Sequence, residues 1–155
     1  MIGTITGCNK EKKLLLTTAV DFFCEKLLGK RMANGVMVDI EVRKKFEFKG
    51  ECINEDMTRR SRWFTIVLRD DDPIEMIKTL AHEMVHVKQH VRNEIGKKHV
   101  ILKKDSMIVL TEWNGSIWKP RPGEDEYYDS PWEIEAYGKE IGLAHQFANF
   151  WNGEK

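Results

Sequence analysis

The residues with the clearest chemical meaning are His82, Glu83 and His86, which form the pattern His-Glu-x-x-His within residues 79–90. Two histidines four positions apart lie on one face of a helix, about one turn from each other, so both imidazoles can reach one metal ion. Glu83, next to the first histidine, can hold a metal-bound water and accept its proton. The pattern therefore predicts a zinc site that performs hydrolysis.

A catalytic zinc ion normally has three protein ligands and one open position, so a third ligand is needed. His90 is excluded because eight residues of helix place it about 12 Å along the axis from His82. The remaining candidates are His99, His145, and the acid pair Glu133 and Glu135. The two acids lie about 200° apart around a helix, so only one of them can face the metal. Glu133 also has the spacing of a capping-box residue after Ser130.

The elements that must position these residues can be read from periodicity, caps and turns. In order they are a helix over 10–28, strands over 36–43, 50–54 and 63–68, a helix from 73 to about 93, a hairpin of 107–113 with 117–118, and a helix from 131 to about 150. Asp72 and Pro73 mark the start of the second long helix, and Asn114-Gly115 is a favoured hairpin turn. We expect one α+β domain over residues 1–155.

Composition limits the classes of partner. The chain has 25 basic and 25 acidic residues, so its net charge gives no support to nucleic-acid binding, although Arg59, Arg60 and Arg62 could contact phosphate. No apolar run is long enough to span a membrane, and the first residues do not resemble a signal peptide. The three cysteines lack metal-site or disulfide spacing, which indicates free thiols in a reducing, cytoplasmic compartment. The oligomeric state carries no sequence signal.

Together, the HExxH helix and the later Glu133-Ile134-Glu135-Ala136 segment resemble the zincin metallopeptidases of the gluzincin kind. In several of those families the third ligand lies in a Glu-x-x-Ala-acid context, so the resemblance implies Glu133 as ligand ahead of Glu135. Tyr137 stands where the family usually has an acid. The carboxylate that orients a ligand histidine is therefore missing from its usual place, and Glu135 is a candidate for that role.

The order of elements also resembles the small SprT-like and phage-encoded minimal zincins, over about residues 60–150. The Trp-Asn-Gly hairpin and Ser-Pro-Trp-Glu-Ile-Glu-Ala-Tyr are most similar to the phage group, which implies the host cytoplasm as location. SprT-like proteins use a third histidine, for which His99 is the only well-placed candidate. The resemblance implies an N-terminal helix, a mixed sheet of about three strands, the HExxH helix, a hairpin, and a C-terminal helix with the third ligand.

This resemblance implies hydrolysis of peptide bonds, with Zn2+ as cofactor, Glu83 as general base and a protein or peptide as substrate. Tyr137, one turn after Glu133, is the first candidate for stabilising the oxyanion, before Tyr127, Tyr128 and His99. The strand 63–68 is expected to be the edge that pairs with the substrate. Tryptophans are expected in packing, with Trp113 and Trp118 as alternatives for the cleft wall. The competing functions are a zinc-binding interaction module of zincin fold and a SprT-like protease acting on DNA-associated proteins.

Overall fold

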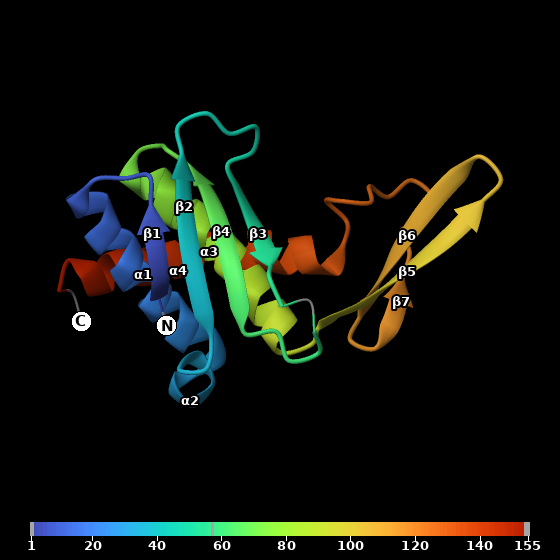
Figure 1. Ribbon diagram of the computed structural model, residues 1–155, viewed down its shortest axis with the longest axis horizontal. Helices are drawn as coiled ribbons and strands as arrows, with labels where there is room; N and C mark the ends of the chain where they lie inside the picture. Colours follow the sequence, from blue (N-terminus) through green and yellow to red (C-terminus); the bar gives the residue numbers. More distant parts are fainter. Residues whose placement is uncertain (1, 57, 154–155) are drawn as a thin grey trace.

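The computed structural model describes residues 2–56 and 58–153. In chain order its elements are β1 (Ile2–Thr6), α1 (Lys10–Leu28), α2 (Lys30–Ala33), β2 (Met37–Arg43), β3 (Gly50–Asn54), β4 (Trp63–Arg69), α3 (Pro73–Val91), β5 (Ile95–Lys103), β6 (Ser106–Trp113), β7 (Ser116–Trp118) and α4 (Pro131–Trp151). They form an α+β fold with a mixed sheet and a separate antiparallel sheet (Figure 1). The predicted fold class is confirmed at this level.

The mixed sheet has the strand order β1-β2-β4-β3. β1 and β4 both run parallel to β2, and β3 runs antiparallel to β4. The sheet has four strands where about three were predicted, because β1 joins it ahead of the first helix. The prediction that 63–68 supplies the edge strand is wrong, since β4 pairs on both sides and β3 lies at the edge. The continuous apolar run of β4 is typical of a central, buried strand.

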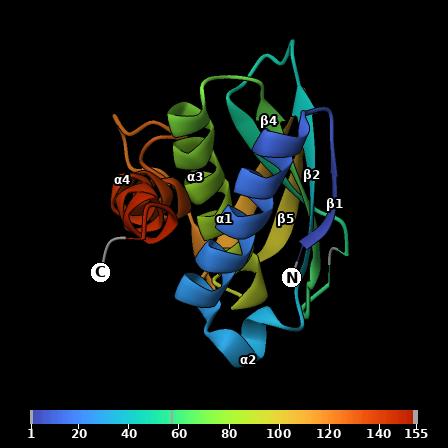
Figure 2. The same ribbon diagram turned by 90° about the vertical axis from the view of Figure 1, so that its left-hand side faces the viewer.

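Three layers stack on one another in the body, which is the mixed sheet with its helices. Figure 2 shows α1 and α3 against one face of the sheet and α4 on the far side of α3. The core between sheet and helices includes Phe23, Ile66 and Leu80, and α4 adds Leu143 and Phe147. α3 is therefore enclosed by the sheet, α1 and α4, which makes it a firm support for side chains that must hold a fixed geometry.

The first long helix ends and the second begins at the predicted signals, and α3 ends at Val91, slightly before the predicted residue 93. The Asn9 side chain caps α1, and Gly29 ends it with a φ of 79°. Asp72 caps α3 by accepting a hydrogen bond from the Glu75 backbone N–H at 3.1 Å, and Pro73 occupies the first helical position. Within the described residues, none of the helices is long and apolar enough to cross a membrane.

β5, β6 and β7 form the antiparallel sheet, and we call residues 95–118 the arm. Figure 1 shows the arm projecting from one end of the body. Asn114 and Gly115 form the predicted two-residue turn, with φ values of 50° and 85°, whereas β5 was not predicted. The base of the arm closes on the body, where the Asn114 backbone N–H donates to the Glu94 carbonyl oxygen at 2.8 Å.

Candidate metal centre

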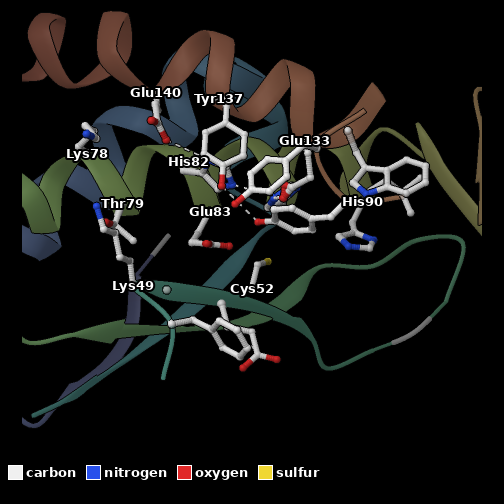
Figure 3. Close-up of a pocket in the computed structure, with 18 of the residues that line it drawn as sticks. Lys49, Cys52, Lys78, Thr79, His82, Glu83, His90, Glu133, Tyr137 and Glu140 are labelled. Carbon is white, nitrogen blue, oxygen red and sulfur yellow. Dashed lines mark hydrogen bonds and ion pairs between the residues drawn. The ribbon is translucent and has the colours of Figure 1, made fainter. Parts of the chain in front are cut away.

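The two histidines of the HExxH pattern and one glutamate converge on a single point. His82 and His86 lie one turn apart on α3. Glu133 projects toward His82 from the first turn of α4 (Figure 3). Glu133 Oε1 lies 3.4 Å from His82 Nε2 and 3.0 Å from His86 Nε2. All three side chains are buried, and their ligand atoms lie within 4.8 Å of one another. This metal group could hold a metal ion.

The spacing of the metal group suits a small four-coordinate cation. Ligand atoms at about 2.0–2.1 Å from a tetrahedral metal lie about 3.4 Å from one another. The two distances from Glu133 Oε1 to the histidine rings are close to that value. Glu133 Oε2 is buried and has no hydrogen-bond partner among the residues that the structure describes. A carboxylate in this position has spare capacity to bind a cation.

A glutamate two turns further along α4 fixes the orientation of the first histidine. His82 Nδ1 lies 2.9 Å from Glu140 Oε2. An ionised carboxylate can only accept, so the proton of the neutral ring must be on Nδ1. His82 Nε2 is then unprotonated, and its lone pair points toward Glu133. This is the tautomer that a metal ligand requires.

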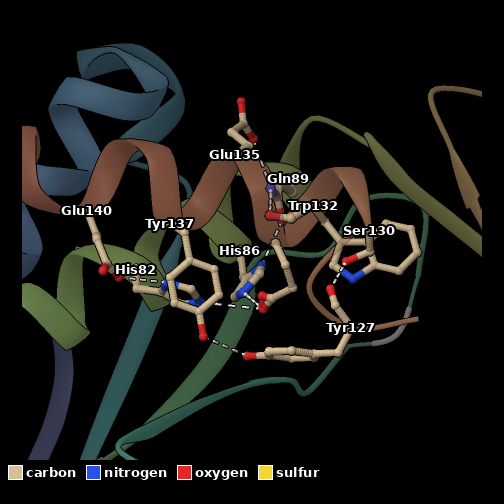
Figure 4. A network of polar contacts seen from close by, with 10 residues as sticks. His82, His86, Gln89, Tyr127, Ser130, Trp132, Glu135, Tyr137 and Glu140 are labelled. Carbon is tan, nitrogen blue, oxygen red and sulfur yellow. Dashed lines mark hydrogen bonds and ion pairs between the residues drawn. The ribbon is translucent and has the colours of Figure 1, made fainter. Parts of the chain in front are cut away.

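Gln89 fixes the second histidine in the same tautomer (Figure 4). Gln89 Nε2 donates to the Trp132 carbonyl oxygen and to Glu135 Oε1, each at 2.9 Å. Both partners only accept, so the amide nitrogen must face them and Gln89 Oε1 must face His86. Gln89 Oε1 lies 2.8 Å from His86 Nδ1, which therefore donates and leaves Nε2 unprotonated. Gln89 is fully buried, so bulk water does not compete for these hydrogen bonds.

The two fixed tautomers make the metal group electron-rich. Each neutral ring directs a lone pair toward the Glu133 carboxylate, an arrangement that is unfavourable unless a cation or protons lie between them. Burial acts to lower the pKa of His82 and of His86, but the hydrogen bond and charge of Glu133 outweigh it and raise both pKa values. The same pairing lowers the pKa of Glu133 to about 2, although burial acts to raise it. The site therefore favours positive charge, which a metal ion can supply.

Glu135 is turned away from the metal group and belongs to a polar layer behind it. Glu135 Oε2 accepts from Lys88 Nζ at 2.7 Å and from Lys139 Nζ at 3.1 Å. Lys88, which is buried, also donates to Glu94 Oε1 at 2.7 Å. The structure therefore does not bring Glu135, the alternative third ligand, to the other ligands. Glu135 instead orients Gln89, and through it the ring of His86, which is close to its other predicted role.

The beginning of α4 directs Glu133 toward α3. Ser130 lies at the N-cap position, but its hydroxyl donates to the Tyr127 carbonyl oxygen at 2.7 Å and does not cap the helix. The Glu133 carboxylate likewise contacts the histidines and not the backbone of Ser130. Glu133 therefore does not act as a capping-box residue, although its spacing from Ser130 would allow that role.

The metal group forms part of the wall of an open cleft of about 990 Å³. α3 and α4 line one side of the cleft and β3 lines the other (Figure 3). A Cβ at Gly50 of β3 would lie 2.6 Å from Thr79 Cγ2 and 3.3 Å from Glu83 Oε1, so the glycine lets this edge strand lie against α3. Glu83 points into the cleft beside β3, and its burial raises its pKa. A raised pKa suits a carboxylate that accepts and returns a proton.

Three tyrosines, Tyr127, Tyr128 and Tyr137, also line the cleft. The ring of Tyr137 packs edge-on against His82, with 4.5 Å between the ring centroids. The hydroxyls of Tyr137 and Tyr127 lie 3.4 Å apart (Figure 4). Burial and this contact raise the pKa of Tyr127, so its hydroxyl remains a donor at neutral pH. Tyr137 therefore lies beside the metal group, and its catalytic role stays a prediction.

The other histidines lie apart from the metal group. His99 is on the arm, where its Nε2 lies 3.4 Å from Glu112 Oε2, and His145 is exposed on α4. The structure therefore does not bring His99, the last alternative ligand, to His82 and His86. His90 lines the cleft beside the ring of Phe64, and burial lowers its pKa to about 4, so it is neutral at physiological pH.

The tryptophans divide between packing and the cleft wall. Trp132 lines the cleft. Trp113 and Trp118 pack against it, with ring centroids 6.3 and 5.3 Å away. The expected packing role therefore holds for these two, which contact the cleft wall through Trp132.

Glu140 and Lys88 are among the residues around the site that sequence reasoning missed. Glu140 lies on the same face of α4 as Glu133 and Tyr137, because positions 133, 137 and 140 are one and two turns apart. That spacing could have indicated Glu140 as the partner of His82. Lys88 has no comparable signal, since a lysine in a helix is usually exposed.

Comparisons of the chain with protein-family models, with curated proteins and with solved structures give no match.

Proposed function

We propose that this protein is a zinc-dependent metallopeptidase with a minimal zincin fold. The strongest support is the convergence of His82, His86 and Glu133, with both Nε2 lone pairs fixed by hydrogen bonds on the other side of the rings. A structural zinc site usually has four protein ligands and is closed. Here the metal group offers three ligands, and all three residues line an open cleft.

Zinc is the metal proposed for this site. Two neutral imidazoles and one carboxylate at tetrahedral separations are a ligand set that zinc prefers. When bound, zinc would lower the pKa of a coordinated water toward neutrality and stabilise negative charge on a substrate carbonyl oxygen. Glu140 and Gln89 hold the two rings in the ligating orientation, so little rearrangement is needed on binding.

Glu83 is the proposed general base. In peptide hydrolysis, water adds to the carbonyl carbon, the C–N bond breaks, and one proton of the water ends on the leaving amine. Glu83 accepts that proton and returns it to the amine nitrogen. Its raised pKa makes both transfers accessible near neutral pH. The hydroxyl of Tyr137, whose ring packs against His82, is the proposed donor to the developing oxyanion.

β3 is the proposed docking strand for the substrate backbone. It is the edge strand on the cleft side of the mixed sheet, and Gly50 to Cys52 line the cleft. An extended peptide can add to such an edge through main-chain hydrogen bonds. The family resemblance implied substrate pairing with residues 63–68. Because β4 lies inside the sheet, we assign this role to β3.

Metal content and hydrolysis test the proposal together. Elemental analysis of the zinc-reconstituted wild type should give about one zinc per chain. Glu133→Ala should lose the zinc because only two ligands remain, whereas His99→Ala, the matched control, should keep it. Glu83→Gln should keep the zinc and lose at least about 100-fold in the rate of peptide hydrolysis.

The outcomes separate the competing functions. Zinc retained in Glu133→Ala but lost in His99→Ala would contradict the proposed ligand set and favour the SprT-like arrangement. A zinc-loaded wild type that cleaves no unfolded protein would contradict the peptidase and favour a zinc-binding interaction module.

A further inference from the structure

The arm carries an apolar surface that its own folding does not explain. Val100 of β5 pairs with Val109 of β6, and Leu102 pairs with Met107. Paired residues of antiparallel strands point to the same face, so these four side chains form one surface, which we call the apolar ladder. Their exposed fractions are 56% for Val100, 47% for Val109, 79% for Leu102 and 63% for Met107. Contiguous exposed aliphatic side chains usually mark a binding surface.

The apolar ladder is continuous with the cleft of the metal group. Lys98 and Thr111 form the next pair toward the body on the same face of the arm, and both line the cleft. Closer to the body, Trp113 and Trp118 lie on this face and pack against Trp132 of the cleft wall. One surface therefore leads from the cleft wall out along the arm.

The direction of the arm fits a chain that leaves the cleft. Figure 3 shows Lys49 and Lys78 at one end of the cleft and His90 at the other, and Figure 1 shows β3 pointing toward the base of the arm. A peptide paired with β3 would leave the cleft toward the arm. A strand rises about 3.3 Å per residue, so the step from Lys98 to Leu102 extends the surface by about 13 Å, the length of about four extended residues.

We propose that the apolar ladder binds the part of the substrate polypeptide that extends beyond the cleft, so that the enzyme favours unfolded chains with aliphatic side chains several residues from the scissile bond. This inference rests on the proposed peptidase function. A folded protein buries most of its aliphatic side chains and cannot lay an extended segment along both β3 and the arm. Lys98, on the same face between the ladder and the cleft, disfavours a cationic segment.

Binding to an unfolded protein of known sequence tests the ladder without requiring cleavage. The probe is reduced, carboxymethylated α-lactalbumin, with native disulfide-bonded α-lactalbumin as its folded counterpart. The parent protein is zinc-loaded Glu83→Gln. One variant adds the ladder pair, Leu102→Thr with Met107→Thr. The other adds the opposite-face pair, Ile101→Thr with Ile117→Thr. Ile101 and Ile117 are 42% and 47% exposed, and threonine preserves strand propensity, so the pairs are matched.

We expect the ladder pair to weaken binding of the carboxymethylated protein about tenfold in Kd and the opposite-face pair to change it less than about twofold. Native α-lactalbumin should not bind. Equal effects of the two pairs, no effect of the ladder pair, or no binding by the parent protein would each overturn the proposal. Circular dichroism and the thermal midpoint check that every variant remains folded.

Two further measurements separate this proposal from its alternatives. Sedimentation shows whether the ladder is covered by a second copy of the chain: a dimer that Leu102→Thr with Met107→Thr converts to monomer would overturn substrate binding. Hydrolysis by the wild type is scored independently with a short peptide that occupies only the cleft. If the wild type cleaves that peptide but the ladder pair does not change binding, the peptidase function is supported and the ladder proposal is wrong. If the peptide is not cleaved but the ladder pair weakens binding, the peptidase function alone is contradicted.

Discussion

The body and the arm treat the same kinds of side chain in opposite ways. In the body, a large cluster of aliphatic side chains is buried between the sheet and the helices, and buried polar side chains such as Gln89 and Lys88 have several partners. On the arm, aliphatic side chains of β5 and β6 face solvent. The buried residues of the body are accounted for by its own stability. The exposed aliphatic residues of the arm are not accounted for in this way. Their presence must be explained by what the arm contacts.

One leucine substitution made in each region gives the largest contrast. Leu80 of α3 is fully buried and Leu102 of the arm is 79% exposed. Leu80→Ala should lower the free energy of unfolding by about 3 kcal/mol, because it leaves a cavity in a close-packed core. Leu102→Ala should change it by less than about 0.5 kcal/mol. Urea unfolding of the metal-free proteins measures both, and a large loss in Leu102→Ala would mean that the arm is covered in solution.

A lysine substitution sharpens the comparison for polar groups. Lys88 Nζ neutralises Glu94 and Glu135 inside the body, at 2.7 Å from each. Lys88→Ala should cost about 2–3 kcal/mol of unfolding free energy, because it removes the cation that pairs with the poorly solvated Glu94 and leaves Glu135 with Lys139 alone. Lys98→Ala, at the exposed base of the arm, should cost less than about 0.5 kcal/mol. Similar small losses in the two variants would show that the layer behind the metal group is open to water.

The smallest expected effect concerns the attachment of β1 to the sheet. Asp39 of β2 accepts hydrogen bonds from the Thr4 backbone N–H at 2.7 Å and from Trp63 Nε1 at 2.8 Å. Burial acts to raise the pKa of Asp39, but these hydrogen bonds outweigh it and lower the pKa. Their stabilisation is therefore present above the unfolded-state pKa of about 3.9 and is lost as the pH falls through the lower folded-state pKa.

Asp39→Ala should accordingly reduce stability by about 1 kcal/mol at pH 7, and the difference from the wild type should shrink below about pH 4. Thermal unfolding across this pH range provides the measurement. Asp105→Ala, in the exposed turn between β5 and β6, is the control and should show no difference at either pH. A difference for Asp39→Ala that is constant with pH would contradict the role of the ionised carboxylate.

The sequence predicted those parts of the structure that depend on local signals. Caps and turn residues located α1, α3 and the Asn114-Gly115 turn, and the histidine spacing located two members of the metal group. β1 and β5 were not predicted, for the same two reasons. Glycine, threonine and lysine weaken the alternating pattern of both strands. Each strand also depends on pairing with a strand that comes later in the chain.

Features that depend on how elements dock could not be read in the same way. Whether Glu133 or Glu135 faces the histidines depends on the rotation of α4 about its own axis relative to α3, which the spacing along either helix does not determine. The same docking brings Glu140 to His82 and Lys88 to Glu135. The edge position of β3 likewise follows from the order of strands, and a short polar strand gives little indication of its neighbours.

The closed base of the arm has a consequence for how the metal group assembles. The histidines and Glu133 are separated by residues 92–130, whose ends must meet before the site exists. The hydrogen bond from the Asn114 N–H to the Glu94 carbonyl oxygen closes residues 95–113 into a local unit. The flexible loop between α3 and α4 is thereby shortened by about half. Each halving of a flexible loop saves about 0.6 kcal/mol of closure entropy. By folding on its own strands, the arm therefore shortens the loop that must close for α4 to bring Glu133 to the histidines of α3.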